Sequence, residues 1–302
     1  MYDIIVVGGG PAGLTAALYG LRNGKKVIVI EKSVFGGQIV NSPKVENIPG
    51  FESISGDEFA DKYLDQVMAQ GGEVLMEEVL SVRKENDHFA ALLDSGKEVE
   101  GLSVILATGT KHRTLGLPME EDFIGNGISF CAVCDGDYYA GKKVVMIGGG
   151  NSAFVESNLL AGIVGELVLL QDLPEFTADE KLREQLFKNS NVRGVTGTKV
   201  LSYIEKDGAL AGVRYEKDGQ VFDEYCDGVF LAVGLVPCGK AFKDLASLDE
   251  RGYFSAGEDC KSVTPGVFVA GDCRTKSLRQ VTTACADGAI AAIAACDYIR
   301  DL

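Results

Sequence analysis

The fold is decided near the N-terminus, by the stretch DIIVVGGGPAG at residues 3–13. A short apolar run is followed at once by a glycine-rich turn, and residues 14–21 are small and apolar, as suits a closely packed helix. A second apolar run, residues 27–30, ends at Glu31. Strand, G-x-G-x-x-G turn, helix and strand in this order are typical of a βαβ unit that binds a dinucleotide.

Each glycine of this turn has a physical role. Gly8 permits the tight turn, Gly10 lets a pyrophosphate approach the backbone, and Gly13 lets the helix pack against the strand. The N–H groups and the dipole at the start of the helix then favour phosphate. Glu31, at the end of the second strand, is placed to accept hydrogen bonds from a ribose.

The same pattern returns in the middle of the chain. Residues 144–147 are predicted to form a strand, 148–153 a second glycine turn, 154–161 a helix and 167–170 the next strand. Two such units predict two nucleotide-binding-type folds in one chain.

The last part of the chain continues the first fold. A strand at 267–270 and a long alanine-rich helix at 282–299 follow the second unit, so we expect the second domain to be inserted into the first. The prediction is an α/β protein with two Rossmann-like, three-layer domains: 1–113 with 243–302, and 114–242 inserted between them.

Composition excludes several classes of protein. Of 302 residues, 46% are hydrophobic and 24% charged, as in soluble globular proteins. No apolar run of about 18 residues predicts a membrane span, and no secretory signal is evident, so we expect a cytoplasmic protein. The net charge of −15 argues against nucleic acid and anionic membranes as partners, and a small acidic partner would need a local basic patch.

Eight cysteines include one C-x-x-C pair, Cys131 and Cys134, followed directly by Asp135. Thiol–disulfide exchange needs a thiolate and a proton donor, which this segment can supply. Half of a zinc site is the alternative, but zinc wants about four ligands, and His88 and His112 show no partner spacing, so we expect no metal. For six isolated cysteines we expect burial as small apolar residues: Cys226, Cys238, Cys260, Cys273, Cys285 and Cys296.

Over essentially its whole length the sequence resembles the low-molecular-weight thioredoxin reductases. The matching segments are 8–13, 36–38, 45–51, 107–109, 115–118, 131–136, 148–153, 271–272 and 279–280.

The resemblance implies FAD in the outer domain, with Asp272 on the ribityl chain and Gln280 near the flavin ring at the start of the last helix. For each contact residue, ordinary turn packing is the alternative. The implied cofactor-binding residues are Gly8, Gly10, Pro11, Ala12, Gly13, Glu31, Lys32, Gly37, Gln38, Asn47, Val79, Ala107, Thr108, Gly109, Gly271, Asp272, Arg279, Gln280 and Val281.

The resemblance also implies how the redox pair works. Cys134 would face the flavin, Cys131 would attack the disulfide of thioredoxin, and Asp135 would be the acid/base group. A homodimer is implied in the same way.

The chain departs from the family at the electron donor. Members that use NADPH carry His-Arg-Arg and a further arginine after the second strand of the inserted domain, where residues 171–177 here read QDLPEFT. Asp172 and Glu175 would repel a 2′-phosphate, and the carboxylate pair usual in the preceding helix reads Val155-Glu156.

Three donors therefore stay open. We favour reduced ferredoxin, because ferredoxin-dependent flavin thioredoxin reductases have lost the same motifs. NADH bound through Asp172 is the alternative, and the acidic segment disfavours NADPH. A flavin-binding redox sensor without turnover is a hypothesis of another class, which the C-x-x-C pair disfavours.

Overall fold

The computed structural model describes residues 1–42 and 45–302. The chain divides into two compact units, a larger one formed by residues 1–40, 54–111 and 236–302, and a smaller one formed by 112–235 and the described part of 41–53. Between them the chain runs through two short strands that pair with each other, β7 (Thr110–His112) and β16 (Leu235–Pro237). The described residues of 41–53, which the sequence analysis placed in the first domain, thus group with the smaller unit.

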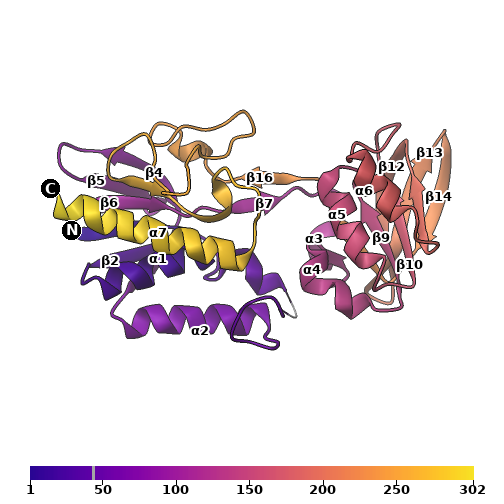
Figure 1. Ribbon diagram of the computed structural model, residues 1–302, viewed down its shortest axis with the longest axis horizontal. Coiled ribbons are helices and arrows are strands. Elements are labelled where there is room, and N and C mark those ends of the chain that lie inside the picture. Colours follow the sequence, from indigo (N-terminus) through magenta and orange to yellow (C-terminus); the bar gives the residue numbers. More distant parts are fainter. Residues whose placement is uncertain (43–44) are drawn as a thin grey trace. The chain divides into compact units, whose positions relative to one another are not determined.

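The larger unit is built on a seven-stranded sheet (Figure 1). Its central strand β6 is parallel to β1 and β17 and antiparallel to β5, so a parallel sheet continues into an antiparallel hairpin. In spatial order the strands are β3 (Glu73–Met76), β2 (Val27–Glu31), β1 (Tyr2–Val7), β6 (Glu98–Leu106), β5 (Phe89–Leu93) and β4 (Val79–Lys84), with β17 (Val267–Val269) on β6.

Three helices accompany this sheet, and two of them pack side by side on one face: α1 (Pro11–Arg22) and α7 (Val281–Arg300), with α2 (Gly56–Ala69) beside α1. Successive residues of β1 point to opposite faces. Ile4 and Val6 belong to the core under α1 and α7, whereas Ile5 and Val7 belong to the core on the other face. Fully burying such a side chain contributes about 1.5–3 kcal/mol.

The smaller unit has two sheets. The first is wholly parallel, in the order β11 (Val192–Val195), β10 (Glu166–Leu170), β9 (Lys143–Ile147), β15 (Gly228–Leu231) and β8 (Ile128–Ser129). The second is an antiparallel meander of β12 (Thr198–Lys206), β13 (Ala209–Lys217) and β14 (Gln220–Tyr225).

The parallel sheet lies between helices and the meander. Val144 and Met146 of β9 pack in one core with Phe154, while Val145 and Ile147 pack in the other with Tyr203. Its helices are α3 (Glu120–Phe123), α4 (Ala132–Asp135), α5 (Asn151–Leu160) and α6 (Glu180–Leu186). The predicted class, α/β with two Rossmann-like units, is confirmed. The meander and the β4–β5 hairpin were not predicted.

Two details correct the sequence analysis. Helix α5 begins at Asn151, directly after the glycine turn, and not at Phe154, because Gly150 already takes the N-cap position. Of the six isolated cysteines only Cys260 and Cys273 are buried, and the other four are partly exposed because they lie along α7 or just beyond strand ends. In the part of the chain that the structure describes, no helix is long and apolar enough to span a membrane.

Candidate active site

The first glycine turn connects β1 to α1 in the larger unit. Gly8 has a φ of 109°, and a Cβ atom there would collide with the carbonyl oxygen of Ala107. A Cβ atom on Gly13 would collide with the carbonyl oxygen of Gly8, so helix and turn are in close contact. At Gly10 the nearest atom to such a Cβ is 3.9 Å away, which leaves this backbone open to a ligand.

Glu31 ends β2 beside this turn. One of its carboxylate oxygens accepts a hydrogen bond from the N–H of Gly9 at 2.7 Å, and the other accepts from the N–H of Ser33 at 3.0 Å. A carboxylate has about four lone-pair sites, so both oxygens keep capacity for ribose hydroxyl groups.

Two further loops converge on the turn. Gly37 begins the short 3₁₀ helix η1 (Gly37–Asn41), and a Cβ atom there would lie 3.3 Å from Cα of Gly10. The neighbouring Gln38 donates from its side-chain amide to the carbonyl oxygen of Thr110, just beyond the loop 107–109 that follows β6. The predicted residues of both loops are thereby brought close to the first turn.

Asp272 has the clearest sign of a missing partner. It lies in the 3₁₀ helix η4 (Gly271–Cys273) after β17, and its Oδ1 atom is buried with no hydrogen-bond partner among the described residues. Burial raises the pKa of Asp272, against a smaller opposing effect of Lys276 and Arg279. An unpartnered buried acceptor fits a ligand that offers hydroxyl donors, as the ribityl chain of FAD does.

A buried ion-pair network, which the sequence analysis missed, fixes this loop. Asp287 of α7 accepts from Arg274 at 2.8 and 2.6 Å and from Lys276 at 2.9 Å, and one of its oxygens also accepts from the N–H of Gly271 at 3.0 Å. Burial tends to raise the pKa of Asp287, but the two cations outweigh it and hold the pKa below its usual range. The network holds the start of η4 in place.

The start of α7 completes the larger unit's site. Arg279 donates to the carbonyl oxygen of Asp272 at 3.2 Å and stacks 4.2 Å over the ring of Tyr253. Gln280 is the N-cap of α7 in a capping box with Thr283, and Val281 is the first helical residue.

The remaining predicted cofactor contacts fall into two groups. Pro11 and Ala12 begin α1, and Ala12 packs against the position of Gly271. Lys32 forms a 3.2 Å ion pair with Glu78, next to Val79 at the start of β4. Asn47 lies in a segment that groups with the smaller unit, and its predicted contact with the cofactor stays a prediction.

The redox pair lies at the start of α4 in the smaller unit. Cys131 and Cys134 form a disulfide, with their Cα atoms 5.3 Å apart. The Sγ atom of Cys131 accepts from the N–H of Cys134 at 3.2 Å, and its carbonyl oxygen accepts from the N–H of Asp135 at 3.0 Å. These bonds form one tight turn around the sulfur atoms.

Ser129, another residue that the sequence analysis missed, connects this turn to a buried carboxyl group. Its hydroxyl donates to Oδ2 of Asp135 at 2.5 Å and accepts from the N–H of Cys131 at 3.1 Å. The Oδ1 atom of Asp135 is buried without a partner among the described residues. Burial raises the pKa of Asp135 and the Ser129 bond partly opposes it, so the carboxyl is suited to hold a proton near the sulfurs.

The second glycine turn leads into α5 in the smaller unit. The carbonyl oxygen of Gly149 accepts from the N–H groups of Thr177 and Ala178 at 2.9 and 3.1 Å. At the start of α5 the side chains of Asn151 and Asp179 bind each other, with the Asn151 amide 3.1 Å from a carboxylate oxygen. A carboxylate therefore lies at the N-terminus of α5, the end of a helix that favours phosphate.

No group of three or more His, Cys, Asp or Glu side chains is arranged to hold a metal ion anywhere in 1–42 or 45–302.

Comparison with known proteins gives one consistent result. Residues 2–288 match the family described as pyridine nucleotide-disulphide oxidoreductase. The chain is 36% identical to the thioredoxin reductase of Listeria monocytogenes, covering 100% of this chain and 95% of that protein, and 38% identical to that of Treponema pallidum, covering 100% and 98%. It superposes on the crystal structure of thioredoxin reductase from Streptococcus pyogenes with a TM-score of 0.91, at 35% identity over 100% of this chain and 99% of that one.

Proposed function

We propose a route by which electrons pass through this chain. The chain belongs to the pyridine nucleotide-disulphide oxidoreductase family and, within it, to the thioredoxin reductases. The chain is a flavin-dependent oxidoreductase with FAD as its cofactor. We propose that it reduces thioredoxin and that reduced ferredoxin is its electron donor. The observation that carries this is the Cys131–Cys134 disulfide beside the buried Asp135, in a chain whose other unit has an open dinucleotide turn.

The residues of the larger unit would hold FAD as their positions indicate. The open backbone at Gly10 and the start of α1 suit the pyrophosphate, Glu31 suits the ribose, and the unpartnered Asp272 suits the ribityl chain. When bound, the cofactor supplies the two-electron chemistry that links a donor to a disulfide.

The cysteine pair and Asp135 would then act on thioredoxin. The thiolate of Cys131 attacks the substrate disulfide to form a mixed disulfide, and Cys134 resolves it, which regenerates the internal disulfide and releases reduced thioredoxin. Asp135, whose pKa is raised by its burial, would give a proton to the departing sulfur.

The donor proposal is supported by the second glycine turn. Asp172 and Glu175 take the place of phosphate-binding arginines, and the Asn151–Asp179 pair adds a third carboxylate at the start of α5. Each like charge about 4 Å from a phosphate costs roughly 4 kcal/mol at an effective dielectric constant near 20. NADH through Asp172 remains the alternative, since the turn itself keeps its glycines.

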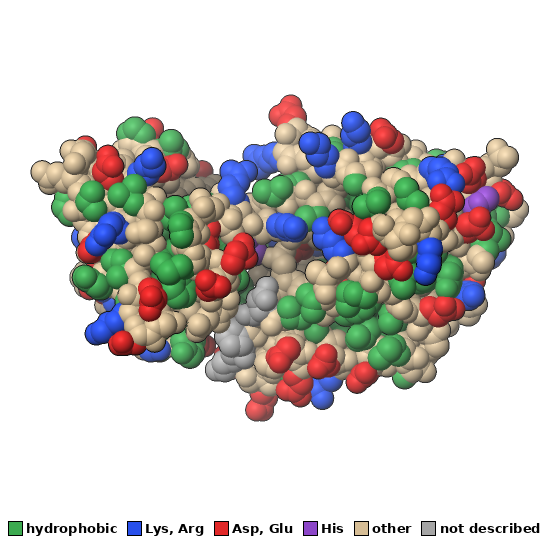
Figure 2. All heavy atoms as spheres, turned by 180° about the vertical axis from the view of Figure 1, so that it is seen from behind, with side chains coloured by type: hydrophobic (Ala, Val, Ile, Leu, Met, Phe, Trp, Pro, Cys, Tyr) green, Lys and Arg blue, Asp and Glu red, His purple; other side chains and the backbone are tan. Residues whose placement is uncertain are grey.

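Three exposed lysines of the larger unit suit an acidic donor protein. Figure 2 shows lysine and arginine side chains gathered on part of this unit, in a chain of net charge −15. Lys111, Lys240 and Lys243 are exposed and have no ion-pair partner among the described residues, and Lys111 is close enough to Cys238 to oppose the rise in its thiol pKa that burial causes. We call these three residues the lysine patch.

Anaerobic mixing tests the donor. Reduced ferredoxin should bleach the flavin rapidly, whereas NADPH and NADH should leave it oxidised. Rapid bleaching by either nicotinamide would overturn the ferredoxin proposal.

Replacing one cysteine tests the route to thioredoxin. Cys134→Ser should keep FAD bound and lower the rate of thioredoxin reduction by at least about a thousandfold, because the mixed disulfide can no longer be resolved. Turnover by this variant would contradict the assignment, and turnover by the unaltered protein separates a reductase from a sensor.

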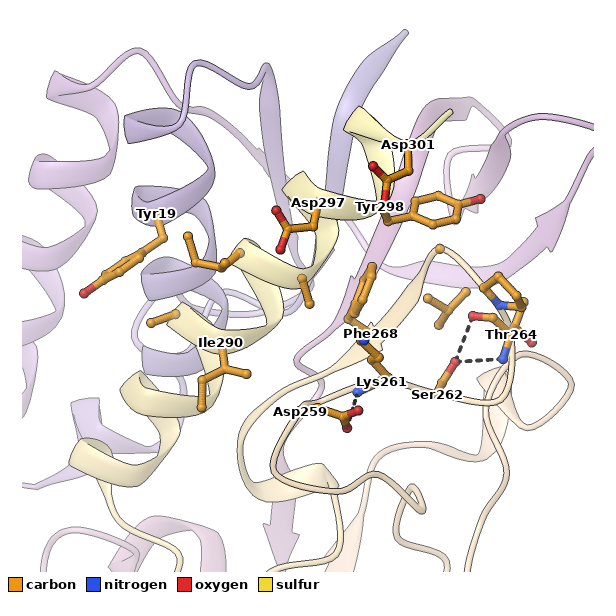
Figure 3. A pocket seen from close by; sticks show the side chains of 16 residues that line it. Tyr19, Asp259, Lys261, Ser262, Thr264, Phe268, Ile290, Asp297, Tyr298 and Asp301 are labelled. Atoms are coloured by element: carbon orange, nitrogen blue, oxygen red, sulfur yellow. Dashed lines mark hydrogen bonds between the residues drawn. The ribbon is translucent and has the colours of Figure 1, made fainter.

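We also propose a homodimer, formed through the outer face of α1 and α7. Tyr19 and Ile290 are about 40% exposed on these helices, beside a pocket of about 770 Å³ that they line together with Ile293 (Figure 3). A second copy would cover this apolar surface. Light scattering of the purified protein should give twice the mass of one chain, and a monomer would contradict this.

A further inference from the structure

A second buried carboxyl group lies against the redox pair. Glu156 sits in the middle of α5, and its carboxyl accepts from the backbone N–H of Ala132, the residue directly after Cys131. Its Oε2 atom is buried and has no hydrogen-bond partner among the described residues. One turn further along, Leu160 packs against Gly136 at the end of α4. Helix α5 therefore holds a carboxyl group against the segment that carries the disulfide.

The surroundings of Glu156 favour its neutral form. Burial raises its pKa to about 7, and the Ala132 N–H opposes this only in part. The titratable and charged groups on the elements packed against α5 are Asp135 of α4, Lys143 of β9, and Glu180, Lys181, Arg183 and Glu184 of α6. Lys143 pairs with Glu166 and Glu224, and none of these groups forms a salt bridge with Glu156 in the described structure.

We propose that Glu156 is a positioning residue of the Cys131–Cys134 pair, and that its ionisation, transmitted through the Ala132 amide and its own charge, sets the reactivity of the reduced Cys131 thiol. The proposal rests on the proposed function only in that the cysteine pair is reduced and reoxidised.

The proton balance gives the expected direction. Reduction by a dithiol breaks the S–S bond, transfers two electrons and leaves a thiol and a thiolate when one proton is taken up, while the reductant becomes a disulfide. With Glu156 protonated, the thiolate forms beside a neutral group. With Glu156 ionised, it would form beside a negative charge, so the Cys131 sulfur keeps its proton to higher pH.

Alkylation of the reduced protein tests this without any electron donor or thioredoxin. The protein is reduced with dithiothreitol, freed of reductant and treated with iodoacetamide between about pH 5 and about pH 9, with each cysteine followed by mass spectrometry. In the unaltered protein the rate of alkylation at Cys131 should rise with pH in two steps, one below and one above the pH at which Glu156 ionises. Glu156→Gln should show one step and react about tenfold faster at pH 8, equivalent to a lowering of the thiol pKa by about one unit.

The variants separate a charge effect from a structural one. Glutamine keeps an oxygen for the Ala132 N–H, so a merely structural role predicts an unchanged profile for Glu156→Gln, and that result would overturn the proposal. Glu184→Gln makes the same chemical change at an exposed position of α6 and should leave the profile as it is. If Glu156→Gln fails to fold, the unaltered protein still decides: a single step at Cys131 across the whole range would overturn the proposal.

Discussion

The two glycine turns leave their strands in the same way and then meet different surroundings. The N–H of Gly8 donates to the carbonyl oxygen of Ile30 at 2.8 Å, and the N–H of Gly148 donates to that of Leu170 at 2.9 Å. Both first glycines have a positive φ, 109° and 131°. The backbone frame of a dinucleotide site is therefore present twice.

The difference lies at the C-terminal end of the second strand of each unit, where Glu31 is the last residue of β2 and Gln171 directly follows β10. Ile30 and Leu170 accept the equivalent hydrogen bond from the first glycine of their turns, so the next residues, Glu31 and Gln171, are also equivalent. Each of these two side chains lies against the middle glycine of its turn. Glu31 brings a carboxylate to the first turn, whereas Gln171 brings a buried neutral amide to the second, and Asp172 comes one position later, exposed. The glycine turn fixes the same backbone in both units, and the two sites differ in the side chains placed around it.

The sharpest way to break this comparison is to fill the second glycine of each turn. Gly10 and Gly150 have extended backbones that any residue adopts, and the nearest atoms to an added Cβ are 3.9 and 3.7 Å away, so alanine fits the chain at both. Gly10→Ala should weaken FAD binding by about a thousandfold, roughly 4 kcal/mol, because the methyl group occupies the place of the pyrophosphate. Flavin titration of the apoprotein measures this.

The matched variant examines the other turn. Gly150→Ala should leave flavin content, melting temperature and thioredoxin reduction as they are, since we propose that no nucleotide binds there. A large loss of turnover by Gly150→Ala, with flavin and stability intact, would show that the second turn is a working nucleotide site.

The parts of the fold that the sequence predicted are those fixed locally. A glycine turn between a strand and a helix is set by a few adjacent residues, so both βαβ units and the last helix were found. The meander β12–β14 was missed although its two turns, Asp207-Gly208 and Asp218-Gly219, have the positive φ angles and the Asp-Gly signal of two-residue hairpins. The grouping of the described residues of 41–53 with the smaller unit depends on tertiary contacts, which no local pattern encodes.

The site divides in the same way. The redox cysteines and Asp135 are adjacent in sequence, so spacing alone predicted them. Ser129 contacts Asp135 from β8, and a serine at such a position carries no signal of its own. Glu156 was noticed only as part of the altered carboxylate pair, because its contact with Ala132 depends on tertiary packing. Asp287 could have been noticed, because it is the one charged residue in the alanine-rich stretch 281–296.

A second prediction compares the helices that follow the two turns. Ala16, which is fully buried, lies six residues after Gly10, and Glu156 lies six residues after Gly150. Because the folded pKa of Glu156 is raised from 4.5 to about 7, its contribution to stability is complete below about pH 4.5 and is lost as pH rises through about 7. At about 1.4 kcal/mol per pH unit the loss is about 3 kcal/mol.

Urea unfolding at about pH 5 and about pH 8 measures this loss. Glu156→Gln should lower the free energy of unfolding at the acidic pH by little and raise it at the alkaline pH, so that its stability changes less between the two. Glu184→Gln serves as the exposed control. Equal pH dependence in Glu156→Gln and the unaltered protein would mean that α5, like α1, buries no titrating group.

The smallest effect on turnover is expected from variants of the lysine patch. These variants test whether electrons enter the protein there and not at the second glycine turn. Lys240→Glu with Lys243→Glu should lower kcat/KM for reduced ferredoxin about tenfold at low salt, because rim charges act mainly on the rate of encounter. The difference should shrink as ionic strength rises and the Debye length falls below about 10 Å. Reduction of the flavin by a small uncharged donor should be unaffected. The matched charge reversal is Lys188→Glu, at an exposed position of the smaller unit. Equal losses with Lys188→Glu would mean that net charge alone governs the encounter and that the lysine patch is not where ferredoxin docks.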